Sequence, residues 1–157
     1  MFLANKTLLV VLSGLISVTC LAQQTKPVVK PVQPFKPPKV TTSILKYTDS
    51  VAISAADATQ AISQPLVITD AKEVHYSLVT YQFAYKRITV SEDEQGKAYP
   101  SSDMIADRFK ITPLPGTWQS AVNTNLQKGE LLYFFDVTVK DAKGRLFFAP
   151  DLKIAIK

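Results

Sequence analysis

The sequence predicts a mainly β fold, a single antiparallel β-sandwich with one or two short helices. Apolar and polar residues alternate with period two along several segments between residues 64 and 157, as they do in strands that have one face on a core. Helical spacing of apolar residues occurs only in the short stretches 54–63 and 115–130. Many strands with few helices favour two packed sheets, and an immunoglobulin-like arrangement is the expected form.

The first residues are typical of a secretory signal peptide. Lys6 precedes an apolar run over 8–18, and small residues stand at Cys20 and Ala22. We expect a signal peptide over 1–22, cleavage between Ala22 and Gln23, and export to the periplasm. The run is shorter than the roughly 20 residues of a membrane span, so an integral membrane protein is not expected. The alternatives are an outer-membrane lipoprotein acylated at Cys20 and a cell-surface location.

Residues 23–39 are predicted to form an extended linker that precedes one domain over 40–157. The segment holds five prolines and four lysines. Because proline restricts its own backbone and that of the residue before it, polyproline II is favoured over any packed element. We interpret the segment as a spacer, and the alternative is a docking peptide for a partner or an anionic surface.

The net charge of +5 comes from residues before the predicted domain. From Val40 onward, 13 basic and 13 acidic side chains are interspersed, which differs from the clustered basic surface of a nucleic-acid-binding protein. Nucleic acid is therefore excluded as a partner. The single cysteine, Cys20, lies in the signal, so the mature protein has no disulfide and depends on its hydrophobic core.

Three segments before residue 116 are predicted as strands: 64–70, 74–90 and 108–115. The buried phase of 74–90 changes near Leu78–Val79, which indicates a bulge or bend. Residues 91–97 are a polar connection. Of the two helical stretches, 54–63 has Ser54 as N-cap, and 115–130 is expected to begin at Thr117 and to stop at Gly129.

The C-terminal part is predicted to contain a hairpin and a last strand. The core face of residues 131–139 is expected to hold Leu131, Tyr133, Phe135, Val137 and Val139. A turn over 141–144, with Gly144 at a left-handed position, leads to a return strand over 145–149. The last strand, 152–157, places Leu152, Ile154 and Ile156 on one face.

Residues that could support catalysis or metal binding are few. His75 is the only histidine and is interpreted as a surface or half-buried packing residue. The acidic cluster 92–94 lacks the spacing of a calcium loop, and Asp103 and Asp107 have no accompanying motif. Trp118 is expected to anchor its helix on the sheet, or to be an interaction hot spot if it is exposed. No enzyme, metal or cofactor is predicted.

The C-terminal half resembles the C-terminal domain of the gliding-motility protein GldM. The shared pattern is a phenylalanine, a short helix, an L-x-x-G-x-x-(V/L)-x-F strand entry, a K-x-x-D-G-R type of turn and a final P-x-(I/L)-x-(I/V) strand. The matching residues are Phe109, Leu126, Gly129, Leu132, Phe134, Lys140, Lys143, Gly144, Arg145, Pro150, Leu152 and Ile154. The resemblance covers about residues 48–157 and consists of strand and turn patterns without a reactive residue.

The resemblance implies an immunoglobulin-like periplasmic domain that works by protein–protein contact. In the family, membrane helices and further periplasmic domains build a dimeric shaft of the type IX secretion and gliding apparatus. We expect this chain to have a signal peptide and a single domain in their place. The resemblance therefore implies the same type of domain, and it does not by itself imply that the chain is part of the apparatus.

We expect a non-catalytic exported interaction module of the cell envelope, accessory to that apparatus, with envelope proteins as partners and a homodimer as one form. The alternative is a carbohydrate- or cell-wall-binding β-sandwich. The expected contact residues are Tyr81, Tyr85, Phe134 and Phe147.

Overall fold

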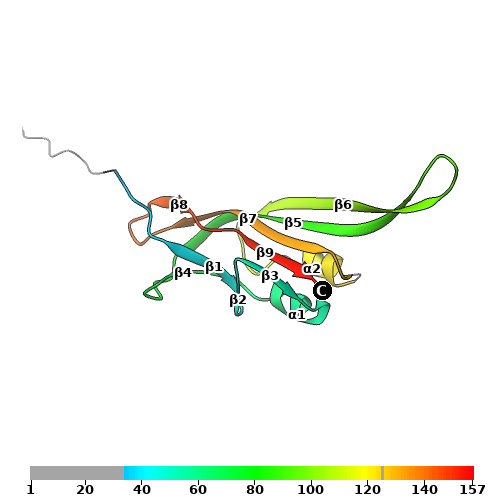
Figure 1. Ribbon diagram of the computed structural model, residues 1–157. Coiled ribbons are helices and arrows are strands. Elements are labelled where there is room, and N and C mark those ends of the chain that lie inside the picture. The colour runs from blue at the N-terminus through cyan, green and yellow to red at the C-terminus, as the bar shows by residue number, and fades with distance from the viewer. Residues whose placement is uncertain (1–33, 125) are drawn as a thin grey trace, which may run out of the picture. The chain divides into compact units, whose positions relative to one another are not determined.

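The computed structural model describes residues 34–124 and 126–157, and a compact unit runs from Phe35 to Lys157 (Figure 1). The predicted signal peptide, its cleavage site at Ala22 and Gln23, Cys20 and most of the linker lie outside the described residues. Within the unit the chain is mainly β, with two sheets and two short helices. The predicted sandwich is therefore confirmed.

A three-stranded and a six-stranded sheet make up the sandwich. The elements are β1 (Val40–Ile44), β2 (Tyr47–Thr48), β3 (Ser50–Ile53), α1 (Ala55–Ile62), β4 (Leu66–Asp70), β5 (Ser77–Glu92), β6 (Ala98–Phe109), α2 (Gly116–Asn123), β7 (Leu131–Lys140), β8 (Leu146–Phe148) and β9 (Leu152–Ile156). The smaller sheet has the order β2-β1-β4, and the larger has β3-β9-β7-β5-β6 with β8 beside β7. The β3–β9 pair is parallel, and the other described pairs are antiparallel.

Aromatic side chains of the large sheet form the centre of the core. The rings of Phe83 and Phe134 have centroids 4.8 Å apart, and Tyr81 lies 6.0 Å from Phe134. The edge-on ring of Trp118, from α2, lies 5.6 Å from Phe83 and 5.5 Å from Phe109. Trp118 is half-buried, so its predicted role as the anchor of its helix is confirmed.

The first helix agrees with the sequence prediction, and the second does not. At α1 the Ser54 hydroxyl accepts from the Asp57 N–H at 3.1 Å, the expected capping contact. Helix α2 has Pro115 as N-cap in place of Thr117, and it ends at Asn123. Gly129 does not terminate it, because the Gly129 N–H donates to the Ile156 carbonyl at 2.8 Å and joins the entry of β7 to β9.

The strand predicted over 108–115 is wrong except at its first two residues, which are the end of β6. Residues 110–115 instead cross between the sheets, where the Ile111 carbonyl accepts from the Tyr81 hydroxyl and the Thr112 hydroxyl accepts from the Leu66 N–H. Strand β6 was missed because most of its side chains are exposed, so its sequence lacks apolar alternation. Pro100 within it is compatible with an edge strand.

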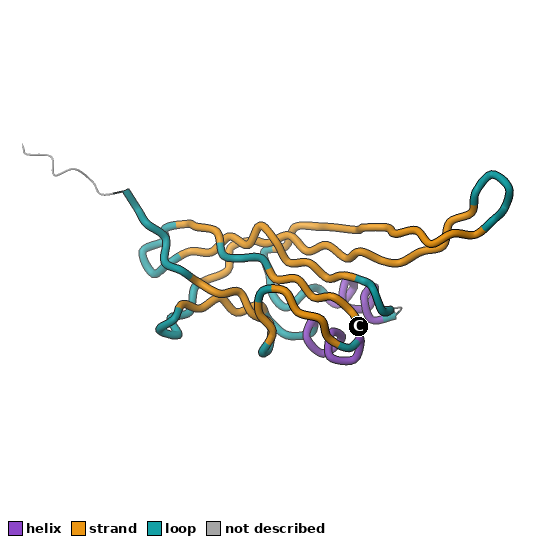
Figure 2. The backbone as a smooth tube through the Cα atoms, viewed as in Figure 1, coloured by secondary structure: helices purple, strands orange, loops and turns teal. Residues whose placement is uncertain are grey.

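The β5–β6 hairpin extends beyond the rest of the large sheet (Figures 1 and 2). Strand β7 pairs with β5 only as far as Lys86, whereas β6 pairs with β5 as far as Glu92. We call residues 87–103 the arm. Its turn is the predicted polar connection, in which the Asp93 carboxylate accepts from the Gln95 and Lys97 N–H groups and Gly96 has a φ of +76°.

The end of the predicted linker packs on the domain. The Phe35 ring lies 6.2 Å from Phe147, and the Arg145 guanidinium lies over Phe35 at 4.1 Å from its centroid. The side chain of Arg145 also bonds to Asp141 in the β7–β8 turn, where Gly144 has the predicted left-handed conformation. These contacts extend the compact unit five residues before β1.

Candidate functional site

A change of phase within β7 decides which of its side chains reach the surface. Leu132 and Phe134 are buried before Asp136, and Val137 and Val139 are buried after it. Asp136 has a φ of +53°, and the pairing of β7 with β5 shifts register in this region. The extra residue moves the side chains that precede it to the opposite face. The predicted core positions Val137 and Val139 are therefore confirmed.

Leu131, Tyr133 and Phe135 are not core residues, which corrects the sequence prediction. All three are half-buried, and none packs against the buried cluster. Both helices lie on the other side of the large sheet (Figure 1). We call this solvent side of the sheet the outer face, and we call these three residues the apolar strip.

The four residues expected as partner contacts are buried, so this prediction is also corrected. Their exposed fractions are 0% for Tyr81, 0% for Tyr85, 1% for Phe134 and 5% for Phe147. Tyr81 and Tyr85 share the buried face of β5, and Phe147 stands edge-on to Tyr76. Burial raises the pKa of the Tyr81 phenol to about 12, because the charged form would lose its hydration.

The apolar strip lies at the centre of a wider outer face. Across the strands, Leu131 pairs with Lys86 and Ala155, and Tyr133 pairs with Ala84 and Lys153. Ala84 is 2% exposed. The same face carries exposed apolar side chains at Met104, next to the base of the arm, and at Ile88, Val90 and Pro100 on the arm. The outer face thus runs without interruption from the sandwich onto the arm.

The aromatic rings of the strip are held in place before any partner arrives. Tyr133 and Phe135 stack with centroids 4.8 Å apart and an interplanar angle of 12°. The Tyr133 hydroxyl donates to the Asp151 carboxylate, which raises the pKa of the phenol because the bond stabilises its neutral form. A fixed ring pair loses little side-chain entropy on binding, which favours contact with a partner.

The acidic groups near the strip have partners within the domain, whereas two lysines do not. Asp136 accepts from Gln82 and from Arg108, each at 2.9 Å, and these bonds lower the pKa of its carboxyl group. Among residues 34–124 and 126–157, neither Lys86 nor Lys153 has a carboxylate within 4.0 Å. Lys153 also borders an open hollow of about 300 Å³ between β3 and β9.

A buried carboxylate fastens the base of the arm. Glu130 is 2% exposed, and its carboxylate accepts from the Tyr85 hydroxyl at 2.6 Å, the Ile88 N–H at 3.1 Å and the Gln127 N–H at 2.9 Å. Burial and this hydrogen bond raise the pKa of the Tyr85 phenol. The sequence analysis did not identify Glu130 as a buried residue, because an acidic residue next to a predicted strand is normally expected to be exposed to solvent.

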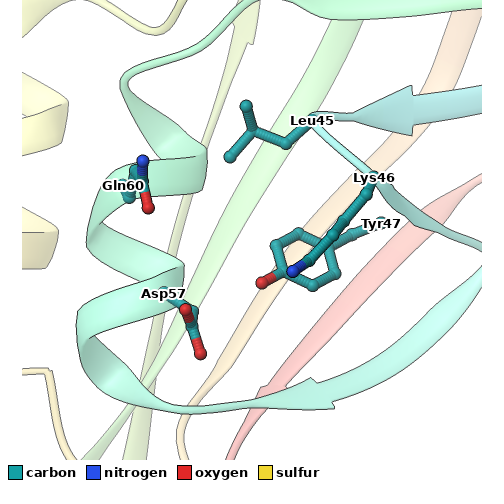
Figure 3. A pocket seen from close by; sticks show the side chains of 5 residues that line it. All are labelled: Leu45, Lys46, Tyr47, Asp57 and Gln60. Carbon is teal, nitrogen blue, oxygen red and sulfur yellow. The ribbon is translucent and has the colours of Figure 1, made fainter.

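A second open hollow lies between the β1–β2 turn and α1 (Figure 3). It has a volume of about 340 Å³ and is lined by Leu45, Lys46, Tyr47, Asp57 and Gln60. The Lys46 ammonium lies 5.5 Å from the centroid of the Tyr47 ring, and Asp57 accepts from the Ser54 hydroxyl at 2.7 Å. The hollow combines an aromatic ring with one cationic, one anionic and one amide side chain.

The remaining polar residues from the sequence do not converge. His75 is exposed and pairs with Thr69 through an isolated bridge. Residues 92–94 lie at the end of the arm, where Asp93 serves the turn. Asp103 pairs with Arg87, and the Asp107 carboxylate accepts from the Arg108 N–H. Within the described part of the chain, no three potential metal ligands come together.

No helix among the described residues is both long and apolar enough to cross a membrane. No protein-family model matches the chain, and no curated protein matches it.

Proposed function

We propose that this chain is a non-catalytic exported module of the cell envelope that binds a protein partner through its outer face. The observation that supports the proposal is the preformed apolar strip on a sheet face that no described residue covers. Contiguous apolar side chains exposed on a folded domain mark interaction sites more often than chance would place them. Aromatic residues held rigid are the usual centres of such interfaces.

The arm supports the same role. It adds apolar side chains, Val90 at 73% and Ile88 at 40% exposed, to the face that carries the strip. A two-stranded ribbon has little stability of its own in water, so a partner that covers one face would gain order as well as contact area. The Glu130 carboxylate holds the base of the arm through hydrogen bonds from the Tyr85 hydroxyl and the Ile88 N–H.

The predicted signal peptide supports the part of the proposal that concerns export to the cell envelope. The resemblance to the GldM C-terminal domain supports a role accessory to the secretion and gliding apparatus. That role predicts co-purification with components of the outer-membrane ring after crosslinking, and its absence under those conditions would remove the apparatus from the proposal while leaving the binding face.

Site-specific photo-crosslinking in the native envelope tests the binding face. A photoreactive residue at Phe135 and, separately, at Met104 is expected to label the same protein, because both positions lie on the outer face. A photoreactive residue at Leu45, which is 48% exposed in the β1–β2 turn, is the control and is expected not to label it. Equal labelling from all three positions, or none from the first two, contradicts the proposal.

Binding of a glycan is the second candidate, and the hollow in Figure 3 favours it. The Tyr47 ring could take the apolar face of a sugar, while Asp57 and Gln60 offer acceptors and donors to its hydroxyl groups. The strip itself suits a glycan less, since Tyr133 and Phe135 each use one ring face on the other. Binding to a glycan array and to peptidoglycan tests this candidate. We expect Tyr47→Ala to lose binding and Tyr133→Ser to retain it. No binding by the wild-type chain would exclude the candidate.

A further inference from the structure

We infer that the free edge of the large sheet pairs, strand to strand, with the same edge of a second copy of this chain. Strand β6 is the last in the order of the large sheet, and among the described residues it pairs only with β5 (Figure 1). The pairing goes beyond the proposed function, because it uses the backbone of β6 and leaves the outer face open.

The direction of the backbone groups in β6 follows from two hydrogen bonds of the neighbouring strand and its turn. The Ile88 N–H donates to Glu130 Oε1 at 3.1 Å, on the side of β5 that faces away from β6. The Asp93 N–H donates to the Lys97 carbonyl at 3.0 Å, across the hairpin. In an antiparallel pair, residues that bond to the partner strand alternate with residues that do not. The odd-numbered residues of β6 therefore bond to β5, and the even-numbered residues present their N–H and C=O groups at the free edge.

The free edge of β6 is closed at two residues and open between them. Pro100 has no N–H, and the outward N–H of Arg108 donates to the Asp107 carboxylate at 2.7 Å. We call residues 102–106 the edge window. Three residues of the window present N–H and C=O groups that have no hydrogen-bond partner in the described part of the chain: Ser102, Met104 and Ala106.

The edge window is symmetric about Met104, which favours a second copy over an unrelated strand. If two copies of β6 run antiparallel with Met104 opposite Met104, Ser102 of each copy lies opposite Ala106 of the other. Every open N–H of the window then faces an open C=O. Pro100 lies opposite Arg108 in this register, so each closed residue faces a closed residue and no N–H loses its partner. A two-fold pair of this kind uses the same surface on both chains and ends at two copies.

The side chains of the window fit the same register. Met104 is 62% exposed, and pairing would place two of these apolar side chains against each other at the centre. Asp103 would lie opposite Ile105, and Asp107 would lie opposite Ser101. No two carboxylates of β6 would therefore face each other across the pair.

Neighbouring registers lack this match. A centre at residue 103 would place Asp103 opposite Asp103, and a centre at residue 105 would place Asp103 opposite Asp107. Like charges directly opposite each other destabilise a strand pair. Centres at residues 102 and 106 would place Met104 opposite Pro100 or Arg108, neither of which has a free N–H. The register centred on Met104 is thus the one that the edge favours.

Sedimentation equilibrium of the purified chain over a range of concentrations tests the pairing. The edge window is a small interface, so we expect a concentration-dependent equilibrium between monomer and dimer. Met104→Lys should raise the dissociation constant about tenfold or more, because it places two ammonium groups opposite each other. Val90→Lys adds the same charge at an exposed residue of β5, away from the free edge, and should leave dimerisation unchanged. A wild-type chain that stays monomeric up to about 1 mM would overturn the inference.

Mixing two variants makes the test specific to the proposed register. Met104→Glu alone should also dissociate, because two carboxylates would face each other. An equimolar mixture of Met104→Lys and Met104→Glu should form a mixed dimer with a dissociation constant close to that of the wild-type chain, since opposite charges then meet at the centre. Dissociated variants that fail to pair when mixed would contradict a centre at Met104.

Proline substitution tests whether the backbone makes the contact. Ser102→Pro removes an open N–H of the window without removing a bond to β5, and it should weaken dimerisation about tenfold. Ala98→Pro is the matched control, because it removes an outward N–H of the same strand outside the window. Dimerisation of Ser102→Pro equal to that of the wild type would overturn pairing through the backbone. Urea unfolding checks that both variants fold, and the Met104 variants decide the outcome if Ser102→Pro does not.

These measurements use the chain alone, without an envelope partner. Loss of the inferred dimer would therefore leave the outer face as the proposed docking site. Conversely, failure of the outer face to label a partner would leave the edge pairing untouched.

Discussion

The hydroxyl of Tyr85 donates a 2.6 Å hydrogen bond to the buried carboxylate of Glu130, which lies 45 residues further along the chain. The same carboxylate accepts from the Ile88 and Gln127 N–H groups. One acidic side chain therefore joins β5 at the base of the arm to the loop that enters β7. Removing the carboxylate would leave the buried Tyr85 hydroxyl without an acceptor and would break the two part-buried bonds to the backbone.

Glu130→Ala is expected to lower the free energy of unfolding by about 2–3 kcal/mol, since it leaves the buried Tyr85 hydroxyl without an acceptor and breaks two part-buried bonds to backbone N–H groups. Tyr85→Phe removes one donor and should cost about 1–2 kcal/mol. The measurement is urea unfolding, with Glu94→Ala, exposed at the end of the arm, as a control expected to stay within about 0.5 kcal/mol. Equal small effects in Glu130→Ala and Glu94→Ala would contradict the role of Glu130.

Three consecutive aromatics in β7 should respond very differently to truncation. Phe134→Ala removes a ring that is 1% exposed and should cost about 3–5 kcal/mol. Tyr133→Ala and Phe135→Ala remove half-buried rings of the outer face and should cost about 1 kcal/mol each. Thermal and urea unfolding measure the difference. A larger cost at Phe135 than at Phe134 would show that the change of phase at Asp136 is wrong.

Gly129 and Gly116 form a matched pair of glycines. Gly129 has a φ of +91°, and an added Cβ would lie 2.8 Å from Ile88 Cδ1, so Gly129→Ala should destabilise the fold by about 1–3 kcal/mol. At Gly116, in the first turn of α2, an added Cβ meets nothing within 4 Å, and Gly116→Ala should stabilise by about 0.5 kcal/mol. Unfolding midpoints measured in parallel check both signs, and a stabilising Gly129→Ala would refute the close packing at the base of the arm.

Asp136 predicts a loss of stability in acid. A hydrogen bond from Gln82, together with the hydrogen bond and the charge of Arg108, lowers the pKa of its carboxyl group below the usual 3.8 in the folded state. The unfolded chain therefore takes up the proton first as the pH falls. The stabilisation is complete above the unfolded pKa and disappears as the pH drops through the lower, folded pKa.

Asp136→Asn should make stability less dependent on pH below about 5 than it is in the wild-type chain. Asp107→Asn, in the neighbouring part of β6, is the control and is expected to leave the acid limb of the stability curve in place. Urea unfolding between pH 2 and pH 7 gives the comparison. An unchanged acid limb in Asp136→Asn would exclude this carboxylate as its source.

The sequence predicted several elements well because their signals are local. Ser54 and Asp57 lie three residues apart and cap α1 with a bond that needs no other part of the chain. Leu152, Ile154 and Ile156 alternate with period two, and all three are buried in β9. The bulge expected near Leu78–Val79 coincides with the register shifts between β5 and β7.

Other features have no local signal. Strand β6 carries mostly exposed side chains, so it shows no alternation, although it forms twelve cross-strand pairs with β5. Within β7 both alternating sets are apolar, and sequence alone does not say where the extra residue at Asp136 enters. Phe134 was expected as a contact residue for this reason: it is in the core, and Tyr133 and Phe135 are on the outer face.

The cap of α1, the alternation of β9 and the apolar character of β7 were determined by the sequence itself, because propensity, capping and alternation act over a few residues. Only the tertiary structure decided which aromatics face solvent, how far the arm extends and which charges keep a free partner position. Those outcomes depend on strand pairing and on burial, which bring together residues far apart in the sequence. The hydrogen bond between Tyr85 and Glu130 is an example.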